Sequence, residues 1–318
     1  MRLLGWWLVI SLLLVFVLSG CAKRFPASGS VISPSANFVA VEGGFLQAPE
    51  LVEASGLAAS RRYSGVLWGI NDSGNEPMLF ALAAEGSDLG QVTLAGAKNV
   101  DWEDLAAFNW QGEPWLLVAD VGDNRAQRDR VIMYALPEPQ ADDSGRFSGT
   151  IQPAWSLTFT YPDGPRDCEA VAVDEAAGQI LLLSKRSDPP MLYRLPLAPS
   201  VDVQPLVASL VGPLDTIPPP TPTDLLLPYG RYRSQPTAMD LSADGRELVI
   251  LTYRHAYLLR RIPGQEWEGI LVEAPQAIAL PDLLTLAQRE AVCFSTDGQS
   301  LFVTGEGAGA ALLHLERR

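Results

Sequence analysis

Five short segments of this chain place an oxygen-bearing side chain at the same point of a repeated motif. Aligned on the apolar residue two positions further on, the copies have these residues at the equivalent position: Ser55, Glu103, Glu169, Thr237 and Glu290. Three of the five are carboxylates. Carboxylate and hydroxyl oxygens, without nitrogen or sulfur, are the ligands that calcium accepts. If the five segments meet at one point, we expect them to enclose a calcium ion.

Carboxylates that lie close together repel one another, and their pKa values rise unless a cation neutralises them. The alternative interpretation is structural, with the glutamates capping neighbouring strands by accepting hydrogen bonds from backbone N–H groups. The chain has two histidines, His255 and His314, and both lie outside the repeated motif. The repeated motif therefore supplies no histidine for a zinc site or for a histidine-dependent catalytic triad.

Each copy of the motif begins an apolar run, and a turn then leads to a second apolar run that ends in polar residues. The copies are about 50 to 70 residues apart, which suits a four-stranded blade with loops of variable length. The sequence therefore predicts an all-β, five-bladed β-propeller with four-stranded blades, six blades being the alternative. The innermost strands of a propeller begin near its central channel, so equivalent positions converge there.

The last copy supplies three strands, at about 290–295, 301–304 and 310–315. Residues 38–45 alternate in the manner of a strand, and we expect this N-terminal strand to complete the final blade and close the ring, which removes open sheet edges. No linker or change of composition divides residues 38–318, so they are predicted to form one propeller domain.

Residues 1–20 carry one positive charge near the start and then a long apolar run, as a secretory signal peptide does. The ending Leu18-Ser19-Gly20-Cys21 resembles the bacterial lipoprotein box. The resemblance implies cleavage before Cys21 and its acylation, for example with palmitate, and the alternative is an uncleaved anchor. Residues 21–37 then form a flexible tether. Ala22 resembles the residue that follows the cysteine in lipoproteins of the outer membrane, so we expect a cell-envelope protein that faces the periplasm.

The net charge of −14 and the pI near 4.6 argue against a nucleic-acid partner, because phosphate backbones require a basic surface. We expect a monomer that contacts the membrane through its lipid. Cys168 and Cys293 belong to the third and fifth blades, which are not adjacent in a five-bladed ring. Both are therefore predicted to be buried free thiols.

The second apolar runs end in charged residues that would share one rim of the ring: Asp72, Asp120, Asp123, Glu306, Lys185, Arg186 and Arg254. A metal ion with neighbouring cations suits a phosphorylated substrate, because the metal polarises a phosphoryl oxygen and the cations neutralise developing charge. The first hypothesis is calcium-dependent hydrolysis of a phosphoanhydride or phosphoester. Asp72 or Asp123 would orient the attacking water, and Lys185, Arg186 and Arg254 would bind phosphate. Ion pairing with the neighbouring acids is the alternative for the three basic residues.

The order Ser, Glu, Glu, Thr, Glu at the five motifs, with the turn Asn71-Asp72-Ser73-Gly74, resembles the calcium-activated nucleotidase (apyrase) family. That resemblance implies a five-bladed propeller with calcium in its central tunnel and hydrolysis of nucleoside diphosphates and triphosphates. Thr237 stands where the family has serine, and residues 120–124 depart from the family's second blade. The chain is also similar to secreted bacterial propellers related to phytase-like and esterase-like ones.

Two other functions remain open at this stage. A glycosidase would need two acids at a defined separation and aromatic platforms for sugars, and few aromatic residues lie near the motifs. A non-catalytic propeller would use calcium structurally and bind a protein or cell-wall partner at its rim, which the fold alone does not exclude.

Overall fold

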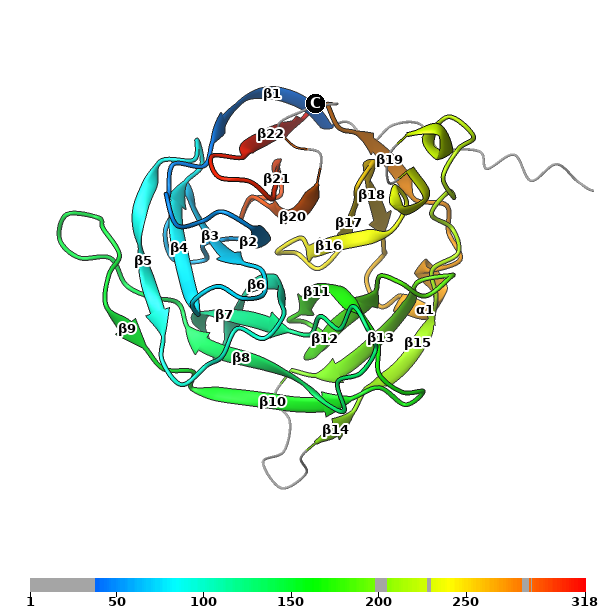
Figure 1. The fold of residues 1–318 in the computed structure, drawn as a ribbon, viewed down its shortest axis with the longest axis horizontal. Coiled ribbons are helices and arrows are strands. Elements are labelled where there is room, and N and C mark those ends of the chain that lie inside the picture. The colour runs from blue at the N-terminus through cyan, green and yellow to red at the C-terminus, as the bar shows by residue number, and fades with distance from the viewer. Residues whose placement is uncertain (1–37, 198–204, 228–229, 282–285, 287) are drawn as a thin grey trace, which may run out of the picture. The chain divides into compact units, whose positions relative to one another are not determined.

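Five sheets, antiparallel apart from one short added strand in each of two blades, stand around a common centre and form the blades of a β-propeller (Figure 1). The computed structural model describes residues 38–197, 205–227, 230–281, 286 and 288–318. The predicted signal peptide and tether, and with them Cys21, lie outside the described residues. The prediction of an all-β propeller with five four-stranded blades is confirmed.

The innermost strand of each blade lies nearest the centre of the ring and is buried along nearly its whole length. These strands are β2 (Ala54–Ala59), β6 (Trp102–Trp110), β11 (Cys168–Asp174), β16 (Pro236–Leu241) and β20 (Arg289–Phe294). Apolar side chains alternate between the two faces of these strands, and each face packs against a neighbouring blade. The hydrophobic core is thus divided among the spaces between blades, as in stacked sheets.

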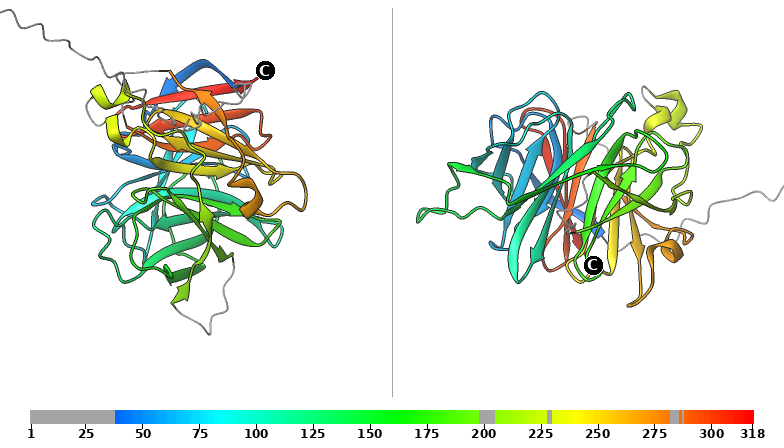
Figure 2. Two further views of the ribbon diagram at one scale, coloured as in Figure 1. Left: turned by 90° about the vertical axis from the view of Figure 1, so that its right-hand side faces the viewer. Right: turned by 90° about the horizontal axis from the view of Figure 1, so that it is seen from below.

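The second and third strands continue each blade outward, each pairing with the strand before it. The second strands are β3 (Val66–Asn71), β7 (Glu113–Asp120), β12 (Gln179–Ser184), β17 (Glu247–Thr252) and β21 (Ser300–Gly305). The third strands are β4 (Met78–Ala83), β8 (Val131–Pro137), β13 (Met191–Pro196), β18 (His255–Arg260) and β22 (Ala311–Arg317). All of them run through the thickness of the ring, from one face to the other (Figure 2).

The outermost strands are β5 (Asp88–Leu94), β10 (Trp155–Thr160), β15 (Ser209–Pro213), β19 (Gln276–Ala279) and β1 (Phe38–Phe45). Two blades have a short extra strand that pairs in parallel with the outermost one, β9 (Thr150–Ile151) on β5 and β14 (Leu206–Val207) on β10. These additions cover part of an exposed sheet edge.

The N-terminal strand closes the ring as predicted. β1 pairs with β22 in antiparallel register from Phe38 opposite Arg317 to Phe45 opposite Ala311. The last blade therefore contains strands from both ends of the described chain, which are joined by backbone hydrogen bonds.

Repeated turn chemistry explains why the hairpins form where they do. In the last two blades the turn after the innermost strand begins with a serine, and its hydroxyl donates to an aspartate two residues later: Ser242 to Asp244 at 2.7 Å and Ser295 to Asp297 at 2.6 Å. Such local side-chain hydrogen bonds favour turns over continued strand.

Helix is rare among the described residues and is confined to connections. The segments are η1 (Asp224–Leu226), η2 (Gly230–Tyr232) and α1 (Trp267–Ile270). Within the described part of the chain, no helix has the length and mean hydropathy of a membrane-spanning segment. The proline-rich residues 217–222 lie in the connection that leads from β15 toward β16, as their missing N–H donors predict.

Candidate functional site

A β-bulge occurs at the same place in all five innermost strands. In each case the pairing with the second strand shifts register around the second residue of the innermost strand: Ser55, Glu103, Glu169, Thr237 and Glu290. A bulge inserts one residue that has no partner on the neighbouring strand and re-aims its side chain. The repeated motif of the sequence is therefore the signature of a bulge at the start of every innermost strand.

These bulges surround a cavity of about 170 Å³. Its lining comprises Ser55, Asp72, Glu103, Asn124, Glu169, Lys185, Arg186, Tyr253, Gln288, Glu290 and Glu306. Four of the five aligned residues belong to this lining. A second set comes from the residue that directly follows the second strand of four blades, namely Asp72, Lys185, Tyr253 and Glu306. We call this cavity the central pocket.

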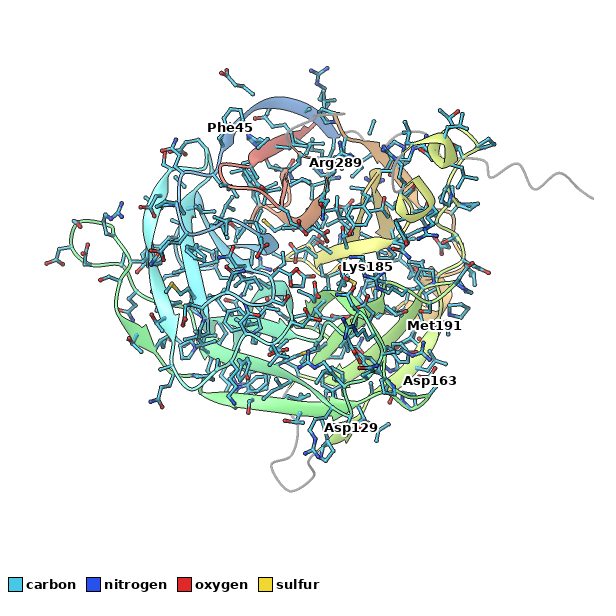
Figure 3. The ribbon with its side chains drawn as sticks, in the orientation of Figure 1. Phe45, Asp129, Asp163, Lys185, Met191 and Arg289 are labelled. Carbon is cyan, nitrogen blue, oxygen red and sulfur yellow. The ribbon has the colours of Figure 1, made fainter. Side chains whose placement is uncertain are left out.

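Lys185 belongs to the lining of the central pocket and lies near the centre of the ring (Figure 3). Its ammonium forms an ion pair with Glu169, lies 3.8 Å from a carboxylate oxygen of Glu290 and stands 5.1 Å from the centre of the Tyr253 ring. The Tyr253 hydroxyl donates to Glu290 at 2.7 Å. Burial opposes the charged form of Lys185, but Glu169 and Glu290 outweigh it and raise its pKa. A protein cation thus neutralises this side of the pocket.

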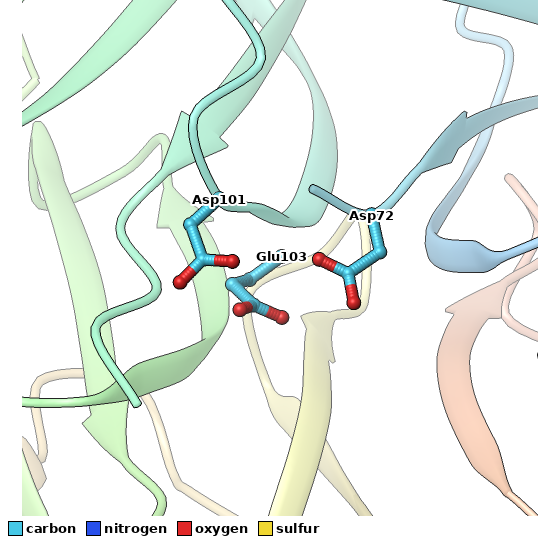
Figure 4. Close-up of side chains that lie close together, drawn as sticks. All are labelled: Asp72, Asp101 and Glu103. Atoms are coloured by element: carbon cyan, nitrogen blue, oxygen red, sulfur yellow. The ribbon is translucent and has the colours of Figure 1, made fainter. Parts of the chain in front are cut away.

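Three carboxylates, of which Asp72 and Glu103 line the pocket and Asp101 lies next to them, have no such partner. Ligand oxygens of Asp72, Asp101 and Glu103 all lie within 4.8 Å of one another, and their carboxylates turn toward a common space (Figure 4). Asp72 follows β3 of the first blade, whereas Asp101 and Glu103 belong to the second blade. None of the three forms an ion pair with any residue that the structure describes. We call them the first acid group.

A second acid group, made of Glu103, Asp167 and Glu169, satisfies the same distance limit and shares Glu103 with the first. Two of its members are already engaged by protein groups. Asp167 contacts Arg186 Nε at 2.6 Å and accepts the backbone N–H of Asp123 at 3.0 Å, while Glu169 is paired with Lys185. The two acid groups therefore differ in their counter-ions.

Glu103 connects the two groups and is the least satisfied of these acids. Its side chain is 5% exposed, and its carboxylate accepts no hydrogen bond from a residue in the described ranges. Burial, followed by repulsion from Glu169, Asp72 and Asp101, raises its pKa well above the ordinary range. A buried carboxylate without a partner is costly, so this position requires either a proton or a bound cation.

The other two acids of the first group have raised pKa values for similar reasons. Burial, with repulsion from Asp72 and Asp167, raises the pKa of Asp101 to about 6. Burial is also the largest cause of the raised pKa of Asp72, and repulsion from Glu53 adds to it. Clustered carboxylates whose pKa values rise together are expected where a cation completes the site.

Gly122 leaves room for the first acid group. A Cβ atom at this position would lie 2.1 Å from Oε1 of Glu103 and 2.6 Å from Cγ of Asp101. Any larger residue would therefore displace both carboxylates. The Gly122 N–H also donates to the backbone carbonyl of Asp101 at 3.2 Å, which ties this loop to the start of β6.

The two hydroxyl residues of the aligned set serve as links between blades. The Thr237 hydroxyl donates to the carbonyl of Arg289 at 2.7 Å, and the Ser55 hydroxyl donates to the carbonyl of Trp102 at 2.9 Å. In both cases the acceptor is the residue just before the aligned position of the next blade. Both residues are buried, but Ser55 lines the pocket and Thr237 does not.

Two more predicted site residues do not line the pocket. Asp123 is buried, and its carboxylate accepts the N–H groups of Gln127 at 2.9 Å and Arg128 at 2.8 Å, so it caps its own loop. Arg254 is paired with Asp224 of the long connection before β16. Of the predicted catalytic and phosphate-binding residues, the pocket thus contains Asp72, Lys185 and Arg186.

The two predicted rim acids, Asp120 and Glu306, lie in different environments. Asp120 is fully buried, is absent from the pocket lining, pairs with Arg128 at 2.7 Å and accepts the N–H groups of Val100 and Asp101. Glu306 does line the pocket. Burial, with repulsion from Glu290 and Asp72, raises its pKa to about 7.

Sequence reasoning missed Asp101 and Asp167, one in each acid group. Both stand two residues before an aligned glutamate, and the corresponding positions of the other copies are Glu53, Gln235 and Gln288. All five are acids or amides. Since side chains two residues apart on a strand point to the same side, this second polar position was a usable signal.

The two cysteines of the propeller are both free and buried, as predicted. Burial is the main cause of the raised pKa of each thiol, which reaches about 12 in Cys168. Reactive cysteines have lowered pKa values, so neither resembles a nucleophile.

No protein-family model and no curated protein sequence matches the chain. Among solved structures it is similar to a luciferin-regenerating enzyme, with 9% identity, 87% of this chain and 95% of that chain covered, and a TM-score of 0.45. It is also similar to the PQQ-bound aldose sugar dehydrogenase of Streptomyces coelicolor, with 11% identity, 89% of this chain and 99% of that chain covered, and a TM-score of 0.42. A third similar structure is hydrazine synthase of Kuenenia stuttgartiensis, with 10% identity, 82% of this chain and 70% of that chain covered, and a TM-score of 0.41. At such values the function has to be argued from the pocket itself.

Proposed function

We propose that the first acid group binds a calcium ion and that the protein uses this ion to hydrolyse a phosphoester or phosphoanhydride. The observation that carries the proposal is the contrast between the two acid groups. Arg186 and Lys185 neutralise two acids of the second group, whereas the first group has three clustered carboxylates, none of them ion-paired with a residue that the structure describes. A bound cation supplies the missing charge.

The donor set fits a hard cation. Asp72, Asp101 and Glu103 offer only oxygen, and no histidine or cysteine belongs to the pocket lining. Calcium accepts carboxylate oxygens in irregular geometry and completes its shell with water, whereas zinc prefers nitrogen and sulfur. The raised pKa values of Glu103 and Asp101 support the same conclusion, because a cation would return both to their charged forms.

When bound, the ion would polarise a phosphoryl oxygen and neutralise negative charge on the substrate. Arg186 supplies the protein's own contact to phosphate: its side chain is 41% exposed at the pocket, close to Asn124 and Asp167. An arginine that retains free donors suits the geometry of phosphate oxygens. Lys185 adds positive charge from the interior of the pocket.

Glu306 is the candidate general base. It lines the pocket but belongs to neither acid group, and a pKa of about 7 allows it to take a proton from water at neutral pH. This assignment replaces the one based on the sequence, because Asp123 caps its own loop and Asp72 is part of the proposed calcium site.

Phosphate release by the purified full-length protein tests this function. Nucleoside diphosphates, nucleoside triphosphates and nitrophenyl phosphate are each supplied with calcium, with magnesium, and with a chelator. We expect turnover that requires calcium and is lost in Glu306→Gln, while calcium affinity is retained. Glu42→Gln, an exposed change in the same blade, is the matched control. Turnover that survives chelation, or no turnover with any of these substrates, would overturn the proposed calcium-dependent hydrolase activity.

A second candidate function is a binding propeller with structural calcium and a protein or cell-wall partner. It is favoured by one observation: the first acid group joins two blades, with Asp72 on one and Asp101 and Glu103 on the next. An ion there would cross-link them. A large calcium-dependent rise in melting temperature without phosphate release supports this candidate, because ligands that bind only the folded state stabilise it.

We also propose that the protein is anchored in the cell envelope by lipid on Cys21. The support is the sequence Leu18-Ser19-Gly20-Cys21 after an apolar run. Mass spectrometry of the intact protein from membranes should show a chain that begins at Cys21 and carries acyl groups. Cys21→Ala should retain the leader and lack the lipid. An unmodified Cys21 in the wild-type protein would contradict the anchor.

A further inference from the structure

The second acid group has the composition of a cation site, but a side chain of the protein already lies against it. Oxygens of Glu103, Asp167 and Glu169 lie as close to one another as those of the first group. The Lys185 ammonium pairs with Glu169 and is 3.8 Å from Glu290. Its side chain is 7% exposed, so water replaces little of this interaction.

We propose that Lys185 occupies a second cation site and thereby limits the central pocket to one divalent ion. The inference rests on the proposed function insofar as the single ion is the calcium of the first acid group. Glu103 is shared by the two groups and has no hydrogen-bond partner in the described residues. Without the lysine it would lie between two cation positions, as the bridging carboxylates of two-metal sites do.

Charge balance explains why the lysine excludes a second ion. A divalent ion at Glu103, Asp167 and Glu169 would face the Lys185 ammonium and the Arg186 guanidinium, each already in contact with one of these acids. Like charges at such distances repel strongly in a buried site. The lysine is also held in place from behind, because the Tyr253 ring faces it and the Tyr253 hydroxyl is fixed on Glu290.

The number of metal ions in the pocket determines which reactions it can perform. Two metal ions stabilise both the attacking and the leaving oxygen of a phosphoryl transfer, whereas one ion leaves half of this task to side chains. Lys185 and Arg186 stand on the side where the second ion would be. Lys185 is therefore a specificity-determining residue: it makes the pocket a one-ion site in which fixed positive charge of the protein replaces the second metal.

The number of calcium ions bound per chain, measured by isothermal titration calorimetry on the full-length protein, tests this inference. Lys185→Met removes the ammonium and keeps much of the apolar stem, and Lys185→Gln is a second variant in case the first fails to fold. Lys98→Met is the matched control, because Lys98 is exposed and outside the pocket lining. We expect one ion in the wild type and in Lys98→Met, and two ions in the Lys185 variants.

The outcomes separate this inference from the proposed function. One ion in the wild type and still one in both Lys185 variants would overturn the inference and leave the proposed calcium site standing. No ion in the wild type but one in Lys185→Met would overturn the proposed calcium site and uphold the lysine as the occupant of a cation site. In the variants, excess calcium should also raise the melting temperature more than in the wild type, since Glu169 and Glu290 then lack their lysine.

Discussion

The two sides of the central pocket are built from the same position of the repeat, yet they neutralise their acids differently. Glu103 and Glu169 occupy equivalent bulges of neighbouring blades. Glu169 meets Lys185, which directly follows the second strand of its blade, whereas the equivalent residue of the first blade is Asp72, which adds a further acid beside Glu103. The residue after the second strand is thus a lysine in the third blade, where it pairs with Glu169, and an acid in the first blade, where it lies near Glu103.

The largest expected effect comes from Glu103→Gln, which removes the charge shared by both acid groups and keeps the shape of the side chain. Calcium affinity, measured by calorimetry, should fall at least about 100-fold, since even the outer partners of metal ligands cost 10–100-fold when removed. Melting temperature in chelator should rise, because a buried carboxylate without a partner is lost. Glu113→Gln, an exposed acid of the same blade, should change neither. Unchanged affinity in Glu103→Gln would end the proposed calcium site.

The paired variants Asp101→Asn and Asp167→Asn compare the two sides directly. Asp101 has no ion pair in the described residues, so its loss should weaken calcium binding by about tenfold and leave the free energy of unfolding in chelator unchanged or higher. Asp167 contacts Arg186 and the N–H of Asp123, so its loss should lower the free energy of unfolding by about 1–3 kcal/mol. Urea denaturation measures the free energy of unfolding of both variants, and calorimetry measures their calcium affinity. Equal effects on stability would remove the distinction between the two sides.

A smaller effect is expected from Thr237→Val, which tests the aligned positions that carry hydroxyls. The hydroxyl bond to the Arg289 carbonyl links two blades, and its loss from a buried site should cost about 1 kcal/mol of unfolding free energy. Calcium affinity should remain as in the wild type, because Thr237 does not line the pocket. A calcium affinity that falls together with stability would return Thr237 to the ligand set predicted from the sequence.

The fold was predictable because its signals are local and repeated. Apolar runs, turns with serine and aspartate, and one polar residue at the start of each innermost strand recur five times, and the bulges give that polar residue a structural reason. The strand at residues 38–45 was predictable from alternation and from the missing strand of the last blade.

The site was predictable only where the blades superpose. Arg254 is drawn away by Asp224, which belongs to a connection that has no counterpart in the other blades. Asp123 bonds to the N–H groups of its own loop, and the sequence does not reveal that fold-back. Lys185 follows the rule for its position, but its inward direction depends on Glu169 and Glu290 of two different blades. Which of several possible partners a side chain contacts depends on how the blades and loops pack, and local sequence patterns do not show this.

The smallest expected effect is a dependence of stability on pH that calcium weakens. Burial is the largest cause of the raised pKa values of Asp101, about 6, and Glu306, about 7, compared with their ordinary values of 3.8 and 4.5. Acids whose pKa is raised by folding bind protons more readily in the folded state. Their contribution to stability is therefore fully present below about pH 4 and is lost as the pH rises through 6 to 7.

Both side chains are partly exposed to solvent, so screening reduces the effect to less than about 1 kcal/mol, at roughly 2–4 °C of melting temperature per kcal/mol. In chelator, the melting temperature should thus be lower at about pH 8 than at about pH 5. Saturating calcium should stabilise the protein more at the higher pH, because the ion and the protons compete for the same oxygens. Glu306→Gln should flatten the profile in chelator. A melting temperature that rises with pH in chelator would mean that these acids are balanced within the protein, and the two sides of the pocket would then be alike.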